Sequence, residues 1–469
     1  MRAVLIAGLV VAALAPAAQA DEVFRIHSSS GTIAPRPTVA VDSRGVGHVV
    51  FRDQEAGARY CRVPRNRNRC DRTLRLAADR RLEDRAHVFA LSDSSIVVVG
   101  TLEIAGGSGS DIALWRSDDG GNSFASVPVA NNEGVNESFD DAALGPGANL
   151  SLGSFSHFTN LSLGSPEAHR SAVLGTGLTN PGGGAVSQAA VGVAGTTPVV
   201  VNWYDEGSEL SFNRLTGGDP HDDANWTEGE LVPGVGEPHP AFLATGNSGL
   251  LLVHHAGGGR YDARLFDGLR FGDPARVRIF ELFSNDAPDQ GGHPDADLFA
   301  QGAAYHAAWD KLARSGGTND VLWSWSLDGR RFSRPLMIAE DVQGEDVQVA
   351  ASSGFRGLAV WGPGISSVFA THLEPVGGFA GCRPPDCELL GGRGTRRVGR
   401  SRLSLDVGFR ECGPPVRLRP RVRRRGSGPR IDRVRFDTGS GETRRVRAEV
   451  RLGGREVTLT RRIRVCPAA

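Results

Sequence analysis

The 469-residue sequence is nearly devoid of lysine, since Lys311 is the only one, and it holds two methionines and four tyrosines. After the first twenty residues, no uninterrupted apolar run reaches the roughly 18 residues that a membrane-spanning helix needs, so we expect no membrane span. No helical spacing of apolar residues persists, which argues against a mainly helical protein. No C-x2-C pair with histidines at ligand spacing occurs, so we expect no metal site and no cofactor.

The N-terminus has the layout of a cleaved secretory signal, with Arg2, an apolar run over 4–14, and small residues before Asp21. We therefore expect a signal peptide over residues 1–20 and a chain that is secreted, extracellular or associated with the cell envelope. Export allows the six cysteines to be read as disulfides. Fifteen pairings of six cysteines exist, and proximity favours Cys61 with Cys70, Cys382 with Cys387, and Cys412 with Cys466.

The formal net charge of zero hides two halves of opposite sign. Residues 391–469 contain 23 arginines and seven acidic residues, a net charge of +16, whereas residues 21–390 carry a net charge of −17. This asymmetry predicts two domains with different surfaces. Arginine in place of lysine, together with abundant alanine and glycine, is typical of a high-GC bacterial coding bias, which by itself offers another explanation for the basic end.

One pattern, an apolar run, a tight turn and a second apolar run, recurs seven times. It occupies 37–51, 86–100, 139–153, 187–203, 239–255, 293–309 and 346–361, with turns near Gly45, Ser94, Gly147, Gly195, Asn247, Gly302 and Gly354. The turns are 48 to 55 residues apart, and such a period with several short strands per unit is typical of a β-propeller. We expect an all-β fold with seven blades, or six if the third or fifth unit is not a blade.

The last repeat has three strand-like segments and lacks a fourth, whereas the segment 22–26 has strand character without a unit of its own. We predict that this segment supplies the missing strand and closes the ring. The propeller then spans 21–376, followed by a Gly/Pro-rich linker over 377–391 that Cys382 and Cys387 pin. Alternating apolar residues and arginines over 392–469 predict a small Ig-like β-sandwich with its arginines in water.

The stretch Arg116–Phe124, RSDDGGNSF, carries carboxylates, a hydroxyl and two glycines between the third and fourth strands of the second unit. Residues 326–332 occupy the same place in the sixth unit, and 267–271 hold a shortened version in the fifth. Repetition favours a structural turn, in which Asp and Ser bind backbone N–H groups and the aromatic residue packs beneath. Calcium ligation is the alternative, although the stretch has few carboxylates for it.

These stretches resemble the Asp-box, or BNR repeat, of sialidase-like propellers, with the pattern S-x-D-x-G-x-x-W/F. The residues that carry the resemblance are Ser117, Asp119, Gly121, Phe124, Ser326, Asp328, Gly329 and Phe332. It covers about 22–375 and implies the propeller fold. Phe24-Arg25-Ile26-His27 is partly similar to the F/Y-R-I-P segment of sialidases, which makes Arg25 a catalytic candidate. No tyrosine falls in a segment that matches the sialidase nucleophile.

The loops that enter the innermost strands and leave the second strands should share the face opposite the Asp-box turns. The ligand-binding candidates there are Arg36, Arg52, His87, Asp140, Tyr204, His239, His293, Asp295 and Asp346, and the further catalytic candidates are Asp53 and Asp205. A merely solvated rim is the alternative, because loops are polar in any soluble protein. Trp203, Trp309 and Trp361 end second strands, where we expect them to fill space between blades rather than stack on sugars.

These features favour a secreted bacterial propeller that binds an extracellular glycan or protein through its channel face, without catalysis. The alternative is an exo-sialidase-like glycoside hydrolase acting on extracellular glycans. The basic domain is expected to hold an anionic cell-surface polymer, unless its arginines are only a solvated face. Nucleic acid is not an expected partner, because no aromatic residues interleave with the arginines.

Overall fold

The computed structural model describes residues 23–464 apart from a set of internal segments. Those segments are 29–33, 54–56, 66, 78–79, 84, 105–108, 130–137, 146–148, 164–169, 177, 179–186, 205–208, 234, 236–240, 247–248, 256–259, 274–279, 282–295, 302–303, 313–318, 327–328, 330–331, 333–335, 343–344, 353–356, 363–366, 374–387, 392–394, 412–416, 428–429 and 438–442. In this part of the chain, no helix is long and apolar enough to cross a membrane.

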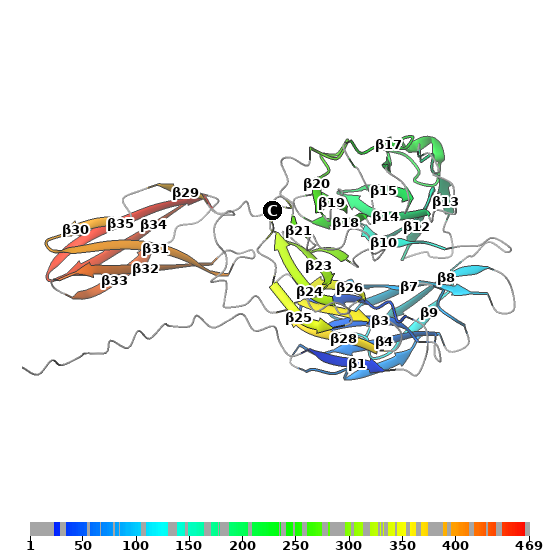
Figure 1. Cartoon of the computed structure of the whole chain (residues 1–469), viewed down its shortest axis with the longest axis horizontal. Helices are drawn as coiled ribbons and strands as arrows, with labels where there is room; N and C mark the ends of the chain where they lie inside the picture. Colours follow the sequence, from blue (N-terminus) through cyan, green and yellow to red (C-terminus); the bar gives the residue numbers. More distant parts are fainter. Residues whose placement is uncertain are drawn as a thin grey trace, which may run out of the picture.

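Seven four-stranded antiparallel sheets form over the first 373 residues, each a blade (Figure 1). Blade 1 has β2 (Thr38–Val41), β3 (Gly47–Asp53), β4 (Gly57–Val63) and β5 (Arg72–Arg75); blade 2 has β6 (His87–Ala90), β7 (Ile96–Glu103), β8 (Ser110–Ser117) and β9 (Ala125–Val127); blade 3 has β10 (Asp141–Gly145), β11 (Asn149–Ser154), β12 (His157–Ser162) and β13 (Arg170–Val173). Blade 4 has β14 (Ser187–Ala194), β15 (Thr197–Tyr204), β16 (Leu210–Arg214) and β17 (Glu230–Leu231); blade 5 has β18 (Ala241–Gly246), β19 (Gly249–His255), β20 (Arg260–Leu265) and β21 (Phe280–Glu281). Blade 6 has β22 (Ala296–Gln301), β23 (Ala304–Leu312), β24 (Asn319–Ser326) and β25 (Leu336–Val342); blade 7 has β26 (Glu345–Ala351), β27 (Gly357–Gly362), β28 (Ser367–Leu373) and β1 (Phe24–Ser28).

The blades form a closed ring. The innermost strands contact one another in the order β2, β6, β10, β14, β18, β22 and β26, and β26 contacts β2 again. This arrangement is a β-propeller, as the repeat predicted, and the third and fifth units are complete blades. All seven expected turns fall between the innermost and second strands of their blades.

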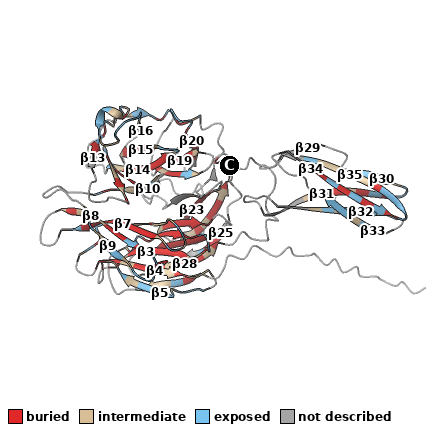
Figure 2. Ribbon diagram, turned by 180° about the vertical axis from the view of Figure 1, so that it is seen from behind, coloured by how far each residue is buried: buried red, intermediate tan, exposed pale blue. Residues whose placement is uncertain are grey.

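The core is divided into apolar clusters between neighbouring blades. β7 is buried along nearly its whole length, whereas β9 is mostly exposed, so apolar content falls from the inside of a blade outward (Figure 2). Trp203, Trp309 and Trp361 lie in the clusters between blades 4 and 5, 5 and 6, and 6 and 7, and all three are buried. Their predicted packing role is confirmed.

The N-terminal strand closes the ring. β1 pairs with β28 in antiparallel register, with Phe24 opposite Ala370 and Ser28 opposite Ser367. The Phe24 side chain is buried in the cluster between blades 7 and 1. The first and last segments of the propeller therefore build one blade together, which confirms the predicted closure.

In blade 1, Cys61 and Cys70 form a disulfide that joins the end of β4 to the segment before β5. This is the pairing that proximity favoured, at the place where blade 2 has its 117–124 turn. Cys382, Cys387, Cys412 and Cys466 lie outside the described residues.

The C-terminal strands build a two-layer β-sandwich, beside the propeller in Figure 1. One sheet has the order β29 (Glu388–Gly391), β35 (Arg455–Arg464), β34 (Thr443–Leu452), β33 (Ile431–Asp437), and the other the order β30 (Thr395–Val398), β31 (Ser401–Glu411), β32 (Arg417–Gly426). Leu403 and Leu405 of one sheet pack on Val446, Ala448 and Val450 of the other. β29 already belongs to the sandwich although the linker was expected to run to residue 391, because Leu389 and Leu390 give strand character to a segment whose neighbours are rich in glycine and proline.

Candidate functional site

The 117–124 turn links β8 to β9 and is held by its own side chains. Ser117 Oγ accepts the Gly121 N–H at 2.8 Å and donates to Asp119 Oδ1 at 2.8 Å. Asp119 Oδ1 also accepts the N–H groups of Asn122 and Ser123, at 2.9 and 3.0 Å. Hydrogen bonds from the Ser123 hydroxyl and N–H, then from Ser117, hold the pKa of Asp119 well below its usual value. The carboxylate is committed to ordering the turn rather than to an external ligand.

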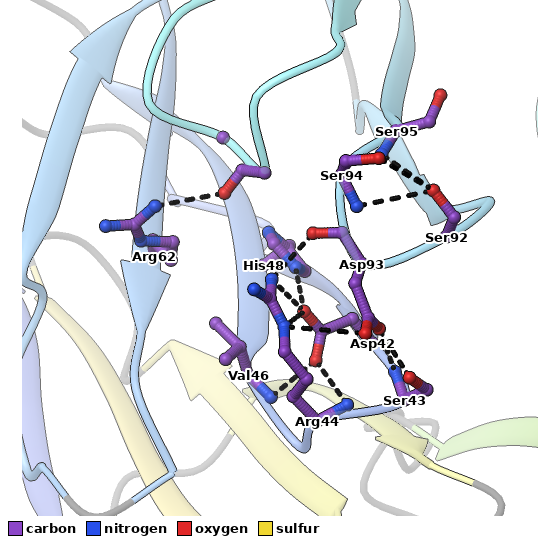
Figure 3. Close-up of polar contacts among 12 residues, drawn as sticks. Asp42, Ser43, Arg44, Val46, His48, Arg62, Ser92, Asp93, Ser94 and Ser95 are labelled. Carbon is purple, nitrogen blue, oxygen red and sulfur yellow. Dashed lines mark hydrogen bonds and ion pairs between the residues drawn. The ribbon is translucent and has the colours of Figure 1, made fainter.

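The same turn packs against the preceding blade. The Phe124 ring lies 4.7 Å from the ring of Tyr60, which belongs to β4 of blade 1. Gly121 has φ +82°, and a Cβ at that position would overlap the Tyr60 hydroxyl. Arg62 of β4 donates to Gly120 O at 3.1 Å (Figure 3). Glycine is therefore required both for the backbone conformation and for the space that Tyr60 fills.

The equivalent turns of blades 5 and 6 pack in the same direction. Phe332 joins the cluster of blade 5 residues around Leu265, and a Cβ on Gly329 would lie 3.0 Å from Leu265 Cδ2. Phe271 contacts Phe212 of blade 4, with ring centroids 5.2 Å apart. Ser326 is buried, and Asp328 lies outside the described residues. In three blades, the aromatic residue of this turn packs against the preceding blade, which agrees with the structural role that repetition predicted.

A buried polar network lies on this face of blade 1 (Figure 3). Asp42 Oδ1 accepts the N–H groups of Arg44 and Val46, both at 2.9 Å, and Asp42 Oδ2 accepts Arg44 Nη2 at 2.7 Å. His48 Nδ1 lies 2.7 Å from the Tyr60 hydroxyl, and His48 Nε2 lies 3.7 Å from Asp42 Oδ2. Burial alone raises the pKa of Asp42, but His48, the Val46 N–H and Arg44 lower it to about 2. Burial lowers the pKa of His48 and raises that of Tyr60.

The opposite face carries the residues that enter the innermost strands and leave the second strands, because strands alternate in direction within each blade. Arg85, before β6, donates to Asp346 Oδ1 at 2.9 Å. This hydrogen bond joins the starts of the innermost strands of blades 2 and 7, which flank blade 1 on either side. His87 Nδ1 lies 3.8 Å from Asp141 Oδ1. Asp141 Oδ2 accepts the N–H of Val191 in blade 4 at 2.9 Å. We name this set of entry and exit residues the channel rim.

Two candidate residues on the channel rim have an uncommon backbone conformation. Arg36 has φ 40° and Asp346 has φ 52°, in the left-handed region that non-glycine residues seldom adopt. Both precede or begin an innermost strand, β2 and β26, of adjacent blades. Strained residues of this kind concentrate at binding sites, where the surrounding fold fixes a conformation that the residue alone would avoid.

The exit of blade 1 is an ion-paired cluster. Asp53 is 3% exposed, and its Oδ2 lies 2.7 Å from Arg59 Nε and 3.6 Å from His27 Nε2. Arg52 Nη1 donates to the backbone oxygen of Glu83 at 2.8 Å. The catalytic candidate Asp53 is thus buried and paired with Arg59, with His27 of blade 7 nearby, in a position that ties blade 7 to blade 1.

Blades 3 and 4 contribute an aromatic pair to the channel rim. Phe155 follows β11, Tyr204 ends β15, and their rings lie 4.8 Å apart, both half-buried. Asp140 Oδ2 accepts the Phe155 N–H at 3.2 Å, and the exposed His157 binds the Phe155 carbonyl through Nδ1 at 3.0 Å. Ser156, with φ 60°, completes the tight turn. Half-exposed rings beside a carboxylate and an imidazole are the side chains that line small-molecule sites.

Four sequence candidates have no described position, and one lies elsewhere on the propeller. Asp205, His239, His293 and Asp295 lie outside the described residues. Arg25 is exposed on β1, the outermost strand of blade 7, three strands away from the innermost strand β26. Within the described ranges, no group of three or more His, Cys, Asp or Glu residues has the arrangement of a metal site.

Four residues of these clusters were not predicted as site residues: Phe155, Ser156, Arg59 and His27. Phe155 could have been found, because it follows a second strand as the other exit candidates do. His27 and Arg59 carried no signal, because they reach Asp53 from an outermost strand and a third strand. Such positions have no fixed spacing from the residue that they contact.

No protein-family model matches the chain, and no curated protein matches it. Solved structures do resemble it. A fungal alcohol oxidase in complex with copper has a TM-score of 0.50 and 9% identity, over 96% of this chain and 99% of that one. An α-L-arabinanase of Penicillium chrysogenum complexed with arabinobiose has a TM-score of 0.42 and 11% identity, over 77% and 100%. An ulvan lyase of a new polysaccharide lyase family has a TM-score of 0.43 and 9% identity, over 74% and 95%. The likeness to the alcohol oxidase spans both the propeller and the sandwich of this chain, and at 9% identity it concerns the fold alone.

Proposed function

We propose that the chain is a secreted propeller protein that binds an extracellular glycan through the channel rim, without catalysis. The observation that carries the proposal is the half-exposed pair Phe155 and Tyr204, with Asp140 and His157 held beside it. A pyranose ring presents apolar C–H groups to an aromatic face and hydroxyls to neighbouring polar groups, so this arrangement suits a sugar. A protein ligand that presents an exposed aromatic side chain is the second candidate for the same surface.

The rim carboxylates favour binding over hydrolysis. Asp53 faces Arg59, Asp141 accepts a backbone N–H of blade 4, and Asp346 accepts Arg85. A glycosidase needs two carboxylates facing one glycosidic bond, or the tyrosine nucleophile of sialidases. Tyr60 and Tyr305 are fully buried between blades. Tyr204 is therefore the rim tyrosine among the side chains that the structure describes, and it contacts Phe155.

We further propose that the 117–124 and 326–332 turns are Asp-boxes. We also propose that the chain is exported and that the sandwich has an Ig-like topology. The leader-like residues 1–20 and the Cys61–Cys70 disulfide support an oxidising, extracellular setting. An exo-sialidase-like hydrolase using Arg25, Asp53 or Asp205 remains the rival function, and the same experiment separates the two.

The test applies the mature chain, starting at Asp21, to an array of immobilised bacterial and host glycans. We expect selective binding that is lost in Phe155→Ala and in Tyr204→Ala. Phe436→Ala is the matched control, because Phe436 is an aromatic residue, 42% exposed, on the sandwich. Unchanged binding in both rim variants would refute the proposed surface. If the protein hydrolysed a fluorogenic sialoside and Asp53→Asn abolished this activity, the function would be hydrolysis rather than binding alone.

A further inference from the structure

Charge is distributed unevenly along the propeller. Residues 34–85, which include blade 1, contain 13 arginines and seven acidic residues. Residues 117–213, which include blade 3 and most of blade 4, contain one arginine, no lysine and ten acidic residues. That arginine, Arg170, lies on β13, the outermost strand of blade 3. The pair Phe155 and Tyr204 therefore belongs to the acidic part of the propeller.

The turn that carries Phe155 is fixed to its surroundings on two sides. Asp140, which precedes β10, accepts the Phe155 N–H at Oδ2 at 3.2 Å. The Ser156 N–H donates to Asn202 Oδ1 at 3.1 Å, and Asn202 lies on β15, the strand that ends with Tyr204. The carboxylate and the two rings are thus held in place before a ligand binds, which reduces the entropy lost on binding.

Three arginines of the channel rim lie at blades 1 and 2. Arg36 precedes β2, Arg52 belongs to β3, and Arg85 precedes β6. Arg52 donates to a backbone oxygen, and Arg85 donates to Asp346 Oδ1. Beside the ring pair at blades 3 and 4, by contrast, the structure places the exposed carboxylate of Asp140. This part of the rim therefore favours a ligand that carries positive charge.

An ammonium group suits this arrangement better than a hydroxyl or a carboxylate. The faces of aromatic rings carry the negative part of the ring quadrupole and attract cations. A carboxylate beside the rings adds a charge-assisted hydrogen bond to an ammonium group, and it repels an acidic sugar. An amino sugar offers an ammonium group and apolar C–H faces on one rigid ring, whereas a lysine side chain loses more conformational freedom when its ammonium group is bound.

We propose that Phe155, Tyr204 and Asp140 bind the protonated amine of an amino sugar, so that the glycan recognised at the channel rim carries free amino groups. This inference rests on the proposed function, because it names the class of glycan that the rim binds. The rings contact the sugar face and the ammonium group, and the carboxylate accepts a hydrogen bond from the same ammonium group. Glycans whose amines are N-acetylated, and acidic glycans, bind more weakly.

The test measures the binding of oligosaccharides to the full mature chain by titration calorimetry. The probes are a linear glucosamine oligomer with free amines, the same oligomer fully N-acetylated, and an oligogalacturonate of equal length. Oligolysine is the fourth probe, because it presents the same ammonium group from a protein. All are measured at pH 6, at which the sugar amines are protonated, and at several salt concentrations, because charge contacts weaken as salt rises.

Two variants separate the local carboxylate from the general negative charge of this part of the propeller. Asp140→Asn removes the charge but keeps an amide oxygen that can accept the Phe155 N–H. Asp118→Asn is the matched control, because Asp118 is an exposed acidic residue of the same 117–213 segment in the turn between β8 and β9, on the opposite face.

We expect the free-amine oligomer to bind about tenfold more tightly than the N-acetylated one, a difference of about 1.4 kcal/mol. Asp140→Asn should reduce this preference to about twofold, the share of the rings alone, and Asp118→Asn should leave it unchanged. The preference is a ratio of two affinities measured on one protein sample. A partly unfolded variant would lower both affinities and keep the ratio, so a fall in the ratio is not a folding defect.

Equal or tighter binding of the N-acetylated oligomer, lost in Phe155→Ala and Tyr204→Ala, would overturn this inference and leave the proposed function standing. An unchanged preference in Asp140→Asn, an equal fall in Asp118→Asn, or oligolysine binding as tight as that of the free-amine oligomer would also overturn it. If the wild type bound no oligosaccharide, here or on the glycan array, the proposed function would fail and this inference with it.

Discussion

The Tyr60 side chain of blade 1 occupies the space that any side chain at position 121 of blade 2 would need, so Gly121 and Tyr60 fit together across the boundary of two blades. Tyr60 is completely buried, its ring packs on Phe124, and its hydroxyl contacts His48. One residue therefore connects the 117–124 turn to the polar network around Asp42. We expect the stability of blades 1 and 2 to depend on this contact.

Replacing Gly121 by alanine should destabilise the propeller by about 3 kcal/mol, from the left-handed backbone and from the clash with Tyr60 together. Gly195→Ala is the matched control, because Gly195 has φ +64° and open space around its Cβ position; it should cost about 1 to 2 kcal/mol. The seven tryptophans all belong to the propeller, so urea unfolding followed by tryptophan fluorescence reports on this domain. Equal losses in the two variants would show that Tyr60 does not restrict position 121.

Stability should fall in acid because of Asp42 and His48. The folded pKa of Asp42 is about 2, below its ordinary 3.8, so its contribution of about 2 kcal/mol is present above pH 3.8 and is lost as pH falls toward 2. Burial lowers the folded pKa of His48, so the unfolded chain binds that proton more readily and stability also falls as pH drops below about 6.5.

The Asp42 contribution can be isolated by Asp42→Asn, which should unfold more easily at pH 7 and show a flatter dependence on pH below 4. Asp118→Asn serves as control, since Asp118 is exposed and forms an ion pair with the neighbouring Arg116. Urea midpoints at pH 7, 5 and 3 measure both effects. If the urea midpoints of Asp42→Asn and the wild type fell by the same amount between pH 7 and pH 3, groups other than Asp42 would be responsible for the loss of stability in acid.

The parts of the fold that depend on local repetition could be predicted from the sequence. The seven turn positions, the closing segment at Phe24–Ser28 and the Cys61–Cys70 pair each had a signal of period, strand pattern or proximity. The tryptophans that end second strands were placed between blades for the same reason. Repeated units impose the same environment on equivalent positions, so one pattern describes many of them.

Contacts between blades could not be predicted from the sequence. Arg85 and Asp346 are 261 positions apart, and their meeting depends on the curvature of the ring, which no spacing encodes. No role was predicted for Tyr60, which the structure buries against His48 and Gly121. For the candidate site, the sequence indicated which strand ends share one face of the propeller, but which of those residues touch each other follows from packing alone.

Loss of the Cys61–Cys70 disulfide should destabilise the propeller by about 2 to 3 kcal/mol, the entropy of closing a loop of 9 residues. The double variant Cys61→Ala/Cys70→Ala tests this without reducing the other cysteines. Its urea midpoint, again followed by tryptophan fluorescence, should fall below that of the wild type. An unchanged midpoint would mean that β4 and β5 are held in register without the bridge.

Removing the closing strand should damage the whole ring. A chain that starts at residue 30 lacks β1, exposes the edge of β28 and uncovers the apolar surface on which Phe24 packs. We expect a lower urea midpoint and self-association through the open edge, measured by light scattering. A synthetic peptide of residues 21–29 should restore the midpoint by pairing with β28, whereas the same peptide with Phe24→Ser and Ile26→Ser should not, because it lacks the apolar side chains that pack between blades 7 and 1. A truncated chain that is monomeric and as stable as the mature protein would show that the three remaining strands of blade 7 close the ring by themselves.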